Sequence, residues 1–360
     1  MSEQNPQKKR GRAAISNPAG RFEKLEYFPD FSDLEEDDDE FSSDVKTIFY
    51  RDTSKSIISF NQSPDVPFDA GINPYRGCEH GCIYCFARPS HEFLGLSAGL
   101  DFETKIFVKH NAATLLRKEL NAKKWQPKPI AISGSTDPYQ PAEKHFRITR
   151  SVLEVLAEFR NPVGIVTKNH LITRDIDLLK ELATHNAIRV VVSVTTLDGA
   201  LARKMEPRTS QPTRRIEAIR KLAEAGIPVG VFTAPVIPGL TDHEIPAIIK
   251  TAADAGASFA GYVMLRLPYS VSGLFEQWLE SNFPERKEKV MNRVRDIRGG
   301  NVNDSRFFER MKGDGAFAEQ VKTLFQAACR NAGIPEGRSD HSRLSTKSFR
   351  RPGDAQMNLF

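Results

Sequence analysis

The sequence has no long apolar run and few cysteines. No stretch of about 18 consecutive apolar residues occurs, so we expect no membrane-spanning segment. The opening segment MSEQNPQKKRGRAA has no apolar core and does not match a secretory signal. The chain has only four cysteines, and three of them lie close together. This pattern argues against a disulfide framework and favours a reducing cytoplasm.

The charges are distributed unevenly along a chain that is otherwise typical of a globular protein. Hydrophobic residues make up 39% and charged residues 27% of the 360 positions, which suits one large α/β domain with extensions. A basic patch at 8–12 is followed by an acidic run at 35–40. Segments of this kind bury too little apolar surface to order themselves, so we expect residues 1–45 to form a disordered arm. A nucleic-acid-binding or partner-binding arm is the alternative.

The clustered cysteines lie in the stretch NPYRGCEHGCIYCFAR at 73–88, with the spacing C-x3-C-x2-C. Three thiolates this close can converge on one soft metal centre, and a set of three leaves a metal position open for another ligand. Gly77 and Gly81 allow the tight backbone that such a loop requires. Two alternatives remain, a zinc site with His80 as a fourth ligand and three ordinary buried thiols.

Apolar strands and amphipathic helices alternate after this loop. Strands are expected at 129–133, 163–167, 189–194, 229–233 and 259–265, with an earlier one at 105–109. The helices between them have apolar residues at i, i+3, i+4 and i+7. Such alternation predicts a parallel α/β sheet that closes fully or partly into a barrel. Polar or glycine- and proline-rich clusters follow the strands, where a barrel carries its chemistry.

The cysteine motif, with Tyr84 as the aromatic residue in CxxxCxφC, resembles the signature of the radical S-adenosylmethionine (SAM) enzymes. The resemblance implies a [4Fe–4S] cluster on Cys78, Cys82 and Cys85, with SAM chelated to the open iron. It also implies an α/β fold, a partial (β/α)6 TIM-type barrel with a C-terminal helical extension. We therefore expect a radical SAM core at 46–270, a helical extension at 271–335 and a flexible basic tail at 336–360.

The resemblance also implies residues that contact SAM. The segment after the second strand would bind the amino group, residues after the next two strands would reach the carboxylate and ribose, and a later backbone segment would pack on adenine. The matching positions are Tyr84, Gly134, Ser135, Thr136, Asp137, Lys168, Ser193 and Ile237. The alternatives are that Asp137 caps a helix and that Lys168 is a solvated charge. Tyr139, Gln140, Glu143 and His145 are candidates for the substrate side of the pocket.

Within the superfamily, the cysteine loop together with TDPYQPAE looks most similar to the group of spore photoproduct lyase, a DNA repair enzyme. Members of that group donate a hydrogen atom from a cysteine in the segment after the second strand, whereas SGSTDPYQ contains none. No catalytic residue is therefore assigned. Cys329 lies in a helical pattern at 317–332 and is expected to be a core residue.

The chain ends in Gln356-Met357-Asn358-Leu359-Phe360, which resembles the sliding-clamp-binding motif of bacterial replication and repair proteins. We expect a cytoplasmic radical SAM enzyme that cleaves SAM reductively and abstracts hydrogen from a substrate, with DNA or another nucleic acid as the leading substrate class. An external electron donor is implied, and no membrane contact is expected. The alternatives are modification of a protein or peptide, and a metal or iron–sulfur binding module without SAM chemistry.

Overall fold

The computed structural model of the chain describes residues 12–14, 16–18, 46–337 and 344–352. In this part of the chain, seven strands form the main sheet in the order β10-β9-β8-β7-β6-β3-β2. Strands β3 and β6 to β10 run parallel, and β2 pairs antiparallel with β3 at one edge. Six parallel strands joined by helices confirm the predicted partial (β/α)6 barrel.

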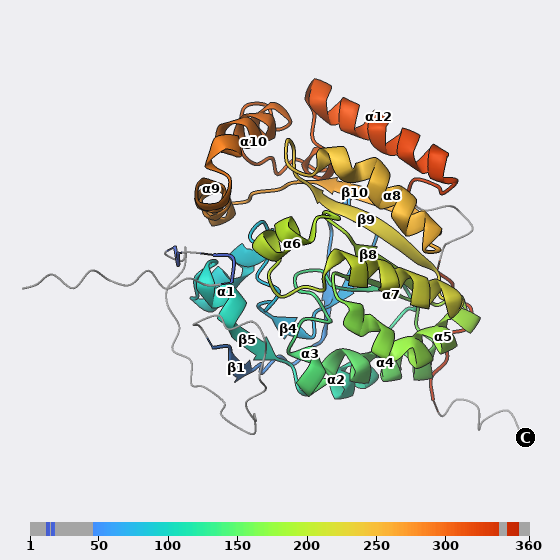
Figure 1. Cartoon of the computed structure of the whole chain (residues 1–360). Helices are drawn as coiled ribbons and strands as arrows, with labels where there is room; N and C mark the ends of the chain where they lie inside the picture. Colours follow the sequence, from blue (N-terminus) through green and yellow to red (C-terminus); the bar gives the residue numbers. More distant parts are fainter. Residues whose placement is uncertain (1–11, 15, 19–45, 338–343, 353–360) are drawn as a thin grey trace, which may run out of the picture.

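The elements follow one another along the chain as Figure 1 labels them. The strands are β1 (Ile48–Arg51), β2 (Ile58–Phe60), β3 (Ala70–Ile72), β4 (Tyr75–Arg76), β5 (Lys105–Val108), β6 (Ile130–Ile132), β7 (Val163–Thr167), β8 (Ile188–Ser193), β9 (Val229–Val236) and β10 (Ala260–Met264). The helices are α1 (Leu100–Thr104), α2 (Ala112–Asn121), α3 (Glu143–Phe146), α4 (Ile148–Phe159), α5 (Ile176–Thr184), α6 (Gly199–Met205), α7 (Pro212–Glu224), α8 (Ile245–Asp254), α9 (Ser270–Asn282), α10 (Pro284–Asp296), α11 (Glu309–Lys312) and α12 (Gly315–Ala332). Short 3-10 helices occur at η1 (Arg88–Leu94), η2 (His170–Asp175) and η3 (Asp242–Glu244).

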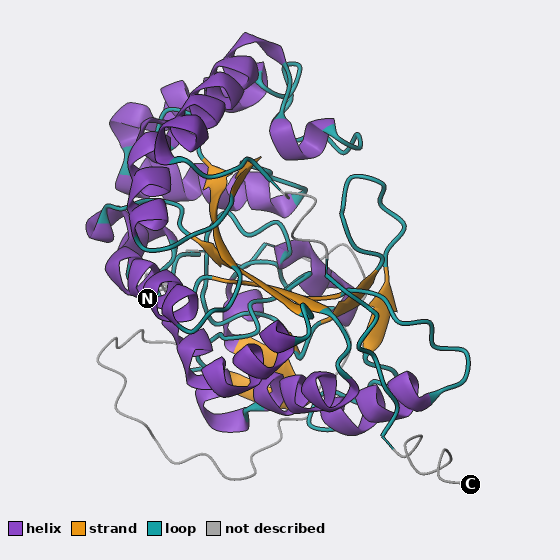
Figure 2. Cartoon of the chain, turned by 90° about the vertical axis from the view of Figure 1, so that its right-hand side faces the viewer, coloured by secondary structure: helices purple, strands orange, loops and turns teal. Residues whose placement is uncertain are grey.

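The strands lie inside a layer of helices, as Figure 2 shows. Every residue of β8 is buried, which is typical of a parallel strand covered on both faces. Helix α4 buries Val152, Leu156 and Phe159 along one face and so packs on the sheet. Gly226 and Gly256 follow α7 and α8 with φ of +74° and +96°, the left-handed conformation predicted for both positions.

The predicted strand at 105–109 forms as β5, but it does not belong to the barrel. It lies in a small sheet of the described chain with the order β1-β5-β4. This sheet flanks the cysteine loop, because β4 ends at Arg76, directly before it, and β5 follows it through η1 and α1. The loop is thus anchored on both sides by strands outside the barrel.

The C-terminal extension consists of α9, α10, the short α11 and α12, as predicted from the helical pattern beyond residue 268. Helix α12 packs along α8, and the ring of its Phe325 lies 4.7 Å from the ring of Tyr262 in β10, tilted by 46°. The chain then reaches the free edge of β10, where the Gly337 N–H donates to Ala260 O at 2.7 Å. This pairing covers an edge strand that would otherwise expose its backbone. Among the described residues, none of the helices combines the length and apolar character needed to cross a bilayer.

Two terminal segments differ from the expectation of a disordered arm and a flexible tail. Residues 12–14 and 16–18 pack against the cysteine loop, and residues 344–352 pack on the outer helices, where Phe349 lies 6.2 Å from the Phe159 ring. The expectation is wrong for these residues, because each segment has defined partners: Arg12 donates to Glu103, and Phe349 packs on Phe159. The acidic run and the terminal Gln356–Phe360 lie outside the described residues.

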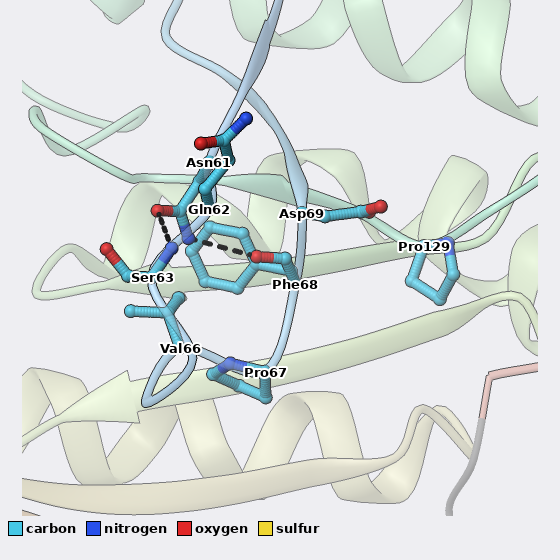
Figure 3. Close-up of a pocket in the computed structure, with 8 residues that line it drawn as sticks. All are labelled: Asn61, Gln62, Ser63, Val66, Pro67, Phe68, Asp69 and Pro129. Carbon is cyan, nitrogen blue, oxygen red and sulfur yellow. Dashed lines mark hydrogen bonds between the residues drawn. The ribbon is translucent and has the colours of Figure 1, made fainter. Parts of the chain in front are cut away.

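A pocket of about 430 Å³ lies between the β2–β3 loop and Pro129, as Figure 3 shows. Within the loop, Asn61 Nδ2 donates to Phe68 O at 3.1 Å, and Ser63 N donates to Asn61 Oδ1 at 2.9 Å. Asp69 and Pro129 directly precede β3 and β6. The pocket is therefore at the amino ends of the strands, opposite the end where a barrel carries its chemistry.

Candidate active site

The cysteine loop is a series of tight turns between β4 and η1. Gly77 and Gly81 adopt φ of +78° and +62°, as the sequence predicted for a close loop. The Cys78 N–H donates to Phe102 O at 2.9 Å, and the Cys85 N–H donates to Cys82 O at 3.2 Å. These bonds hold all three cysteines on one short, ordered segment.

Arg88 holds this loop from the inside. Its side chain is fully buried and pairs with the equally buried Glu103 through Nη2 and Oε1 at 2.5 Å. The remaining donors of the guanidinium go to backbone carbonyls at 2.9–3.1 Å, namely those of Gly81, Cys82, Ala98 and Gly99. A planar fork with five donors suits this task, because it can hold several carbonyls while keeping its charge paired. No motif in the sequence indicates this role for Arg88.

Gln140 fastens the other side of the loop. Its Nε2 donates to Gly77 O at 3.2 Å, and its Oε1 accepts the Glu79 N–H at 2.9 Å. Tyr139 and Glu143 are also fully buried, and Glu143 pairs with Arg174 at 2.7 Å. The prediction that these three face the substrate is therefore wrong, because they are core residues. His145 is exposed.

The three thiols are available as ligands, whereas His80 is not. Cys78 and Cys82 are buried and Cys85 is half-buried, and none forms a disulfide. Burial raises the pKa of all three thiols, so a positively charged iron centre is what would favour their thiolate forms. The His80 Nδ1 lies 3.4 Å from Asp137 Oδ2 and its Nε2 3.1 Å from Asn169 Nδ2. Burial lowers the pKa of His80 to about 4.

The donor set also distinguishes between kinds of metal centre. Across the described residues, no group of three or more His, Cys, Asp and Glu side chains is arranged to hold one metal ion. A tetrahedral zinc ion needs four ligands that meet at one point. A [4Fe–4S] cluster instead binds each thiolate to a different iron, so its ligands surround a larger volume. Three thiols on one loop are the donor set that such a cluster takes when one iron is left for another ligand.

A buried polar network lies beside the loop, at the carboxyl ends of β7, β8 and β9. Lys168 is its centre, and its Nζ is 2.9 Å from both Ser193 Oγ and Thr195 Oγ1. The same nitrogen donates to Ala234 O at 2.8 Å and lies 3.1 Å from Glu206 Oε1. Burial, followed by the charge of Arg215, lowers the pKa of Lys168 to about 7. Lys168 is thus a largely buried, hydrogen-bonded side chain, with 15% of it exposed, rather than the solvated charge of the alternative interpretation.

Glu206 joins this network to the cysteine loop. It accepts hydrogen bonds from the Tyr84 hydroxyl and from Thr195, and it forms an ion pair with the fully buried Arg215. Burial raises the pKa of Glu206, and Arg215 opposes that rise. Tyr84, which follows Cys82 by two residues, therefore shares one carboxylate with Thr195 after β8. Neither Glu206 nor Arg215 had a signal in the sequence.

Residues 72–252 match the family model of the Radical SAM superfamily, which covers half of the chain. The chain belongs to the radical SAM superfamily. It is 37% identical over 234 residues to an uncharacterized protein of Mycobacterium tuberculosis, a match that covers 64% of this chain and 68% of the relative. It is also 31% identical over 224 residues to an uncharacterized protein of Methanocaldococcus jannaschii, with 62% of this chain and 80% of the relative covered.

Three further matches concern two proteins with named activities. A protein of Pseudomonas phage M6 named "Radical SAM Nalpha-GlyT isomerase" is 26% identical over 217 residues, covering 59% of this chain and 43% of the relative. The solved structure of spore photoproduct lyase with a dinucleoside spore photoproduct has a TM-score of 0.56 at 15% identity, covering 80% of both chains. A lyase mutant with bound AdoMet gives a TM-score of 0.53 at 14% identity, covering 82% of both chains. These structures share the fold of the radical SAM superfamily.

Radical SAM enzymes typically use a [4Fe–4S] cluster and SAM. In this chain, the segment predicted to bind the SAM amino group is held by hydrogen bonds to neighbouring strands. The Asp137 carboxylate accepts hydrogen bonds from Thr167 Oγ1 and from the Lys168 N–H, both at 2.7 Å, so it ties the second and third barrel strands together. It also accepts the Tyr139 N–H at 2.9 Å in the turn that follows. Ser135 N donates to Asn73 Oδ1 at 2.8 Å, and Thr136 Oγ1 donates to Tyr75 O at 3.2 Å. The segment is therefore fixed against the strand that leads into the cysteine loop.

Ile237 lies with the cysteine loop rather than in the main core. Its side chain is fully buried in an apolar cluster that also contains Cys82 and Tyr84. Its backbone N–H donates to Thr241 Oγ1 at 2.9 Å, which fixes the turn after β9. Four of the predicted SAM contacts thus lie on one side of the cysteine loop, although they come from separate strand ends or loops: Tyr84, Lys168, Ser193 and Ile237.

Proposed function

We propose that the chain is a SAM-cleaving radical enzyme whose cluster is held by Cys78, Cys82 and Cys85. The observation that carries this proposal is the set of three thiols on one ordered loop, with His80 engaged elsewhere and no fourth ligand among the described residues. A [4Fe–4S] cluster bound there would leave one iron open for SAM and would supply the electron for its reductive cleavage. The match of residues 72–252, which include this loop, to the radical SAM family model supports the assignment.

The residues of the chain itself would bind and orient SAM. The Lys168 ammonium is held by hydroxyls and a carbonyl at the ends of β8 and β9, which places a donor beside Tyr84. The hydroxyls of Ser193 and Thr195 both contact the Lys168 ammonium. Because a hydroxyl both donates and accepts, each could bind SAM in place of its present partner without losing a hydrogen bond. The Ile237 side chain is fully buried, so the backbone of the turn after β9 is what would pack on the adenine ring. Gly134, Ser135 and Thr136 complete the rim through the backbone fixed by Asn73.

The test is anaerobic reconstitution with iron and sulfide, followed by reduction with dithionite in place of the cellular electron donor. We expect about four irons per chain and SAM-dependent formation of 5′-deoxyadenosine, measured by chromatography. Cys82→Ala should lose both, whereas Cys329→Ala is the matched control. Tight binding of one zinc ion by the wild-type chain, with no iron–sulfur absorbance, would show that the assignment is wrong.

The surface next to the loop favours a nucleobase as the substrate. Phe86 directly follows Cys85 and is 50% exposed, and the Arg266 guanidinium after β10 lies 5.1 Å from the centre of its ring. Arg310 lies 4.9 Å from the half-exposed ring of Phe307. Unpaired bases stack on aromatic rings of this kind, and Arg266 is the arginine that would contact their phosphates, because Arg310 is paired with Asp65. The solved structure of spore photoproduct lyase contains a dinucleoside spore photoproduct, which supports the same substrate class.

Fluorescence anisotropy with a single-stranded oligonucleotide tests this substrate class. We expect the affinity for the oligonucleotide to fall as the salt concentration rises. Phe86→Ala should reduce the binding free energy by about 1–3 kcal/mol, the usual contribution of one stacked base. Phe60→Ala is the matched control, because Phe60 is also exposed beside a cation, with Lys128 Nζ 6.0 Å from its ring, but lies in β2. Equal effects of the two substitutions would contradict a base-stacking role for Phe86.

The hydrogen donor of spore photoproduct lyase relatives has no equivalent here. Ser133, Gly134 and Ser135 contain no thiol, and Cys329 is buried in α12 with its pKa raised to about 11 by burial. We therefore propose a reaction in which the substrate radical is not reduced by a cysteine of this chain. Gln356–Phe360 is proposed to bind a sliding clamp, which would bring the enzyme to DNA.

A further inference from the structure

Residues 12–14 and 16–18, which we call the N-terminal strap, lie directly against the cysteine loop. The Arg12 N–H donates to Glu103 Oε2 at 3.0 Å, across a separation of 91 residues in the chain. The Arg12 guanidinium donates to the backbone oxygens of Glu79 and Glu103 and to Thr47. It also lies 3.5 Å from Glu79 Oε1, with only 4% of its side chain exposed. A buried cation with this many acceptors has a defined place.

Glu103 connects the strap to the residue that holds the cluster loop. Its Oε1 accepts both the Arg88 guanidinium at 2.5 Å and the Ala14 N–H at 3.1 Å. Its Oε2 accepts the Arg12 N–H. Arg88 in turn donates to Cys82 O at 2.9 Å. A chain of buried hydrogen bonds therefore runs from the strap through one carboxylate to the backbone of a cluster cysteine.

The strap also covers the loop by direct packing. A Cβ on Gly81, between Cys78 and Cys82, would lie 3.0 Å from Arg12 Cβ. Ala13 and Ala14 are buried in the same apolar cluster as Cys82 and Tyr84. The strap thus closes the outer side of the loop.

The second half of the strap is tied to the helices around the loop. A Cβ on Gly99 would meet the Ser16 carbonyl oxygen at 2.2 Å, so the strap backbone lies on this glycine. Ser97 Oγ donates to Pro18 O at 2.5 Å, and Ser16 Oγ is 2.8 Å from Gln277 Oε1 in α9. The strap therefore bridges the loop region and the C-terminal extension.

We propose that the N-terminal strap keeps the cluster loop in its ligand-binding conformation and shields the cluster from solvent, and that Arg12 is its positioning residue. The proposal rests on the proposed function, because the loop must be the one that binds the cluster. The strap acts through Glu103 and Arg88 and by covering Gly81. Loss of the strap should open the loop while the barrel stays folded.

Residue-resolved alkylation of the anaerobic, metal-free chain tests the strap without needing a cluster. Wild type, Arg12→Ala and a chain without residues 1–18 are treated with iodoacetamide, and each cysteine is followed by mass spectrometry. We expect Cys78 and Cys82 to be alkylated about ten- to a hundredfold faster in both variants. The reason is that losing one or two charge-assisted hydrogen bonds makes opening of the loop more frequent by about this factor. Cys329, buried in α12, reports global unfolding and should keep its wild-type rate.

Two controls distinguish the strap from a general effect. Arg117→Ala removes an exposed arginine that pairs with Glu158, and it should change none of the four rates. Arg12→Lys keeps the charge but not the fork and should give an intermediate rate. In the reconstituted protein, the iron–sulfur absorbance of Arg12→Ala should bleach faster in air than that of wild type.

The outcomes separate the two proposals. Unchanged rates at Cys78 and Cys82 in both strap variants would overturn the strap proposal, even if the wild type cleaves SAM. Equal acceleration at Cys329 would also overturn it, because the strap would then support the whole fold. Failure of wild type to assemble an iron–sulfur cluster would instead overturn the proposed function, with the alkylation result still decided separately.

Discussion

Replacing Arg88 should destabilise the metal-free protein more than any surface arginine does. The guanidinium is fully buried, pairs with the fully buried Glu103 and donates to four backbone carbonyls around the cluster loop. In Arg88→Ala, the Glu103 carboxylate keeps only its backbone donors from Arg12 and Ala14. The four carbonyls lose a donor that water can replace only if the loop opens.

The expected magnitude follows from this burial. Removing one partner of a buried ion pair costs about 3–5 kcal/mol of unfolding free energy, because the other charge stays buried without compensation. Arg88→Lys keeps the charge but has one compact ammonium in place of a planar fork, so it should cost about 2 kcal/mol or more. Arg117→Ala, whose pair with Glu158 is exposed, should cost at most about 1 kcal/mol.

The assay is denaturant unfolding of the anaerobic, metal-free chain, followed by iron content after reconstitution. The double substitution Arg88→Met with Glu103→Gln removes both charges and should be less destabilising than Arg88→Ala alone. A loss below about 1 kcal/mol for Arg88→Ala would refute the reasoning, as it would show that the pair does not organise the loop. Wild-type iron content in that variant would refute its link to the cluster.

Three other predictions address the network, the fourth cysteine and the terminus. Burial lowers the pKa of Lys168 from 10.5 to about 7, so at pH 7–9 the unfolded chain binds more protons than the folded one. The unfolding free energy of the wild type should therefore rise with pH in this range. Lys168→Met should flatten this rise, measured by denaturant unfolding at several pH values, and an unchanged slope would contradict the lowered pKa. This pH range ends near pH 9, because burial raises the pKa of the cysteine thiols in the folded chain, and above that pH their titration lowers the unfolding free energy. Cys329→Ala should leave iron content and 5′-deoxyadenosine formation unchanged, because this thiol packs in α12; lost cleavage would give it a catalytic role. Deleting Gln356–Phe360 should abolish sliding-clamp binding in a pull-down but not SAM cleavage, and retained binding would show that the terminal motif is not the docking segment.

Much of the candidate site could be predicted because its signals are local. The three cysteines lie within eight residues, so any fold that closes this loop brings them together. Lys168, Ser193 and Ile237 could be placed because the carboxyl ends of parallel strands meet at one end of a barrel. Their spacing along the chain therefore predicted their neighbourhood in space.

Buried polar residues could not be assigned in the same way. Gln140 and Glu143 follow a strand end and look like pocket residues in the sequence, yet both are fully buried and hold the core. Arg215 lies in α7 among other charged residues, and its burial and its partners, Glu206 and the Ser193 carbonyl, distinguish it. Whether a charge is solvated or paired depends on which element packs beside it.

By itself, the sequence determined the alternation of apolar strands and helices, the parallel barrel and the cysteine loop, because these depend on residue period and short spacings. The tertiary structure alone decided how the loop is held. The partners of Arg88, Glu206 and Arg12 are up to 122 residues away along the chain. Such pairs carry no periodic signal, since they form only after separate elements have packed and water has left the space between them.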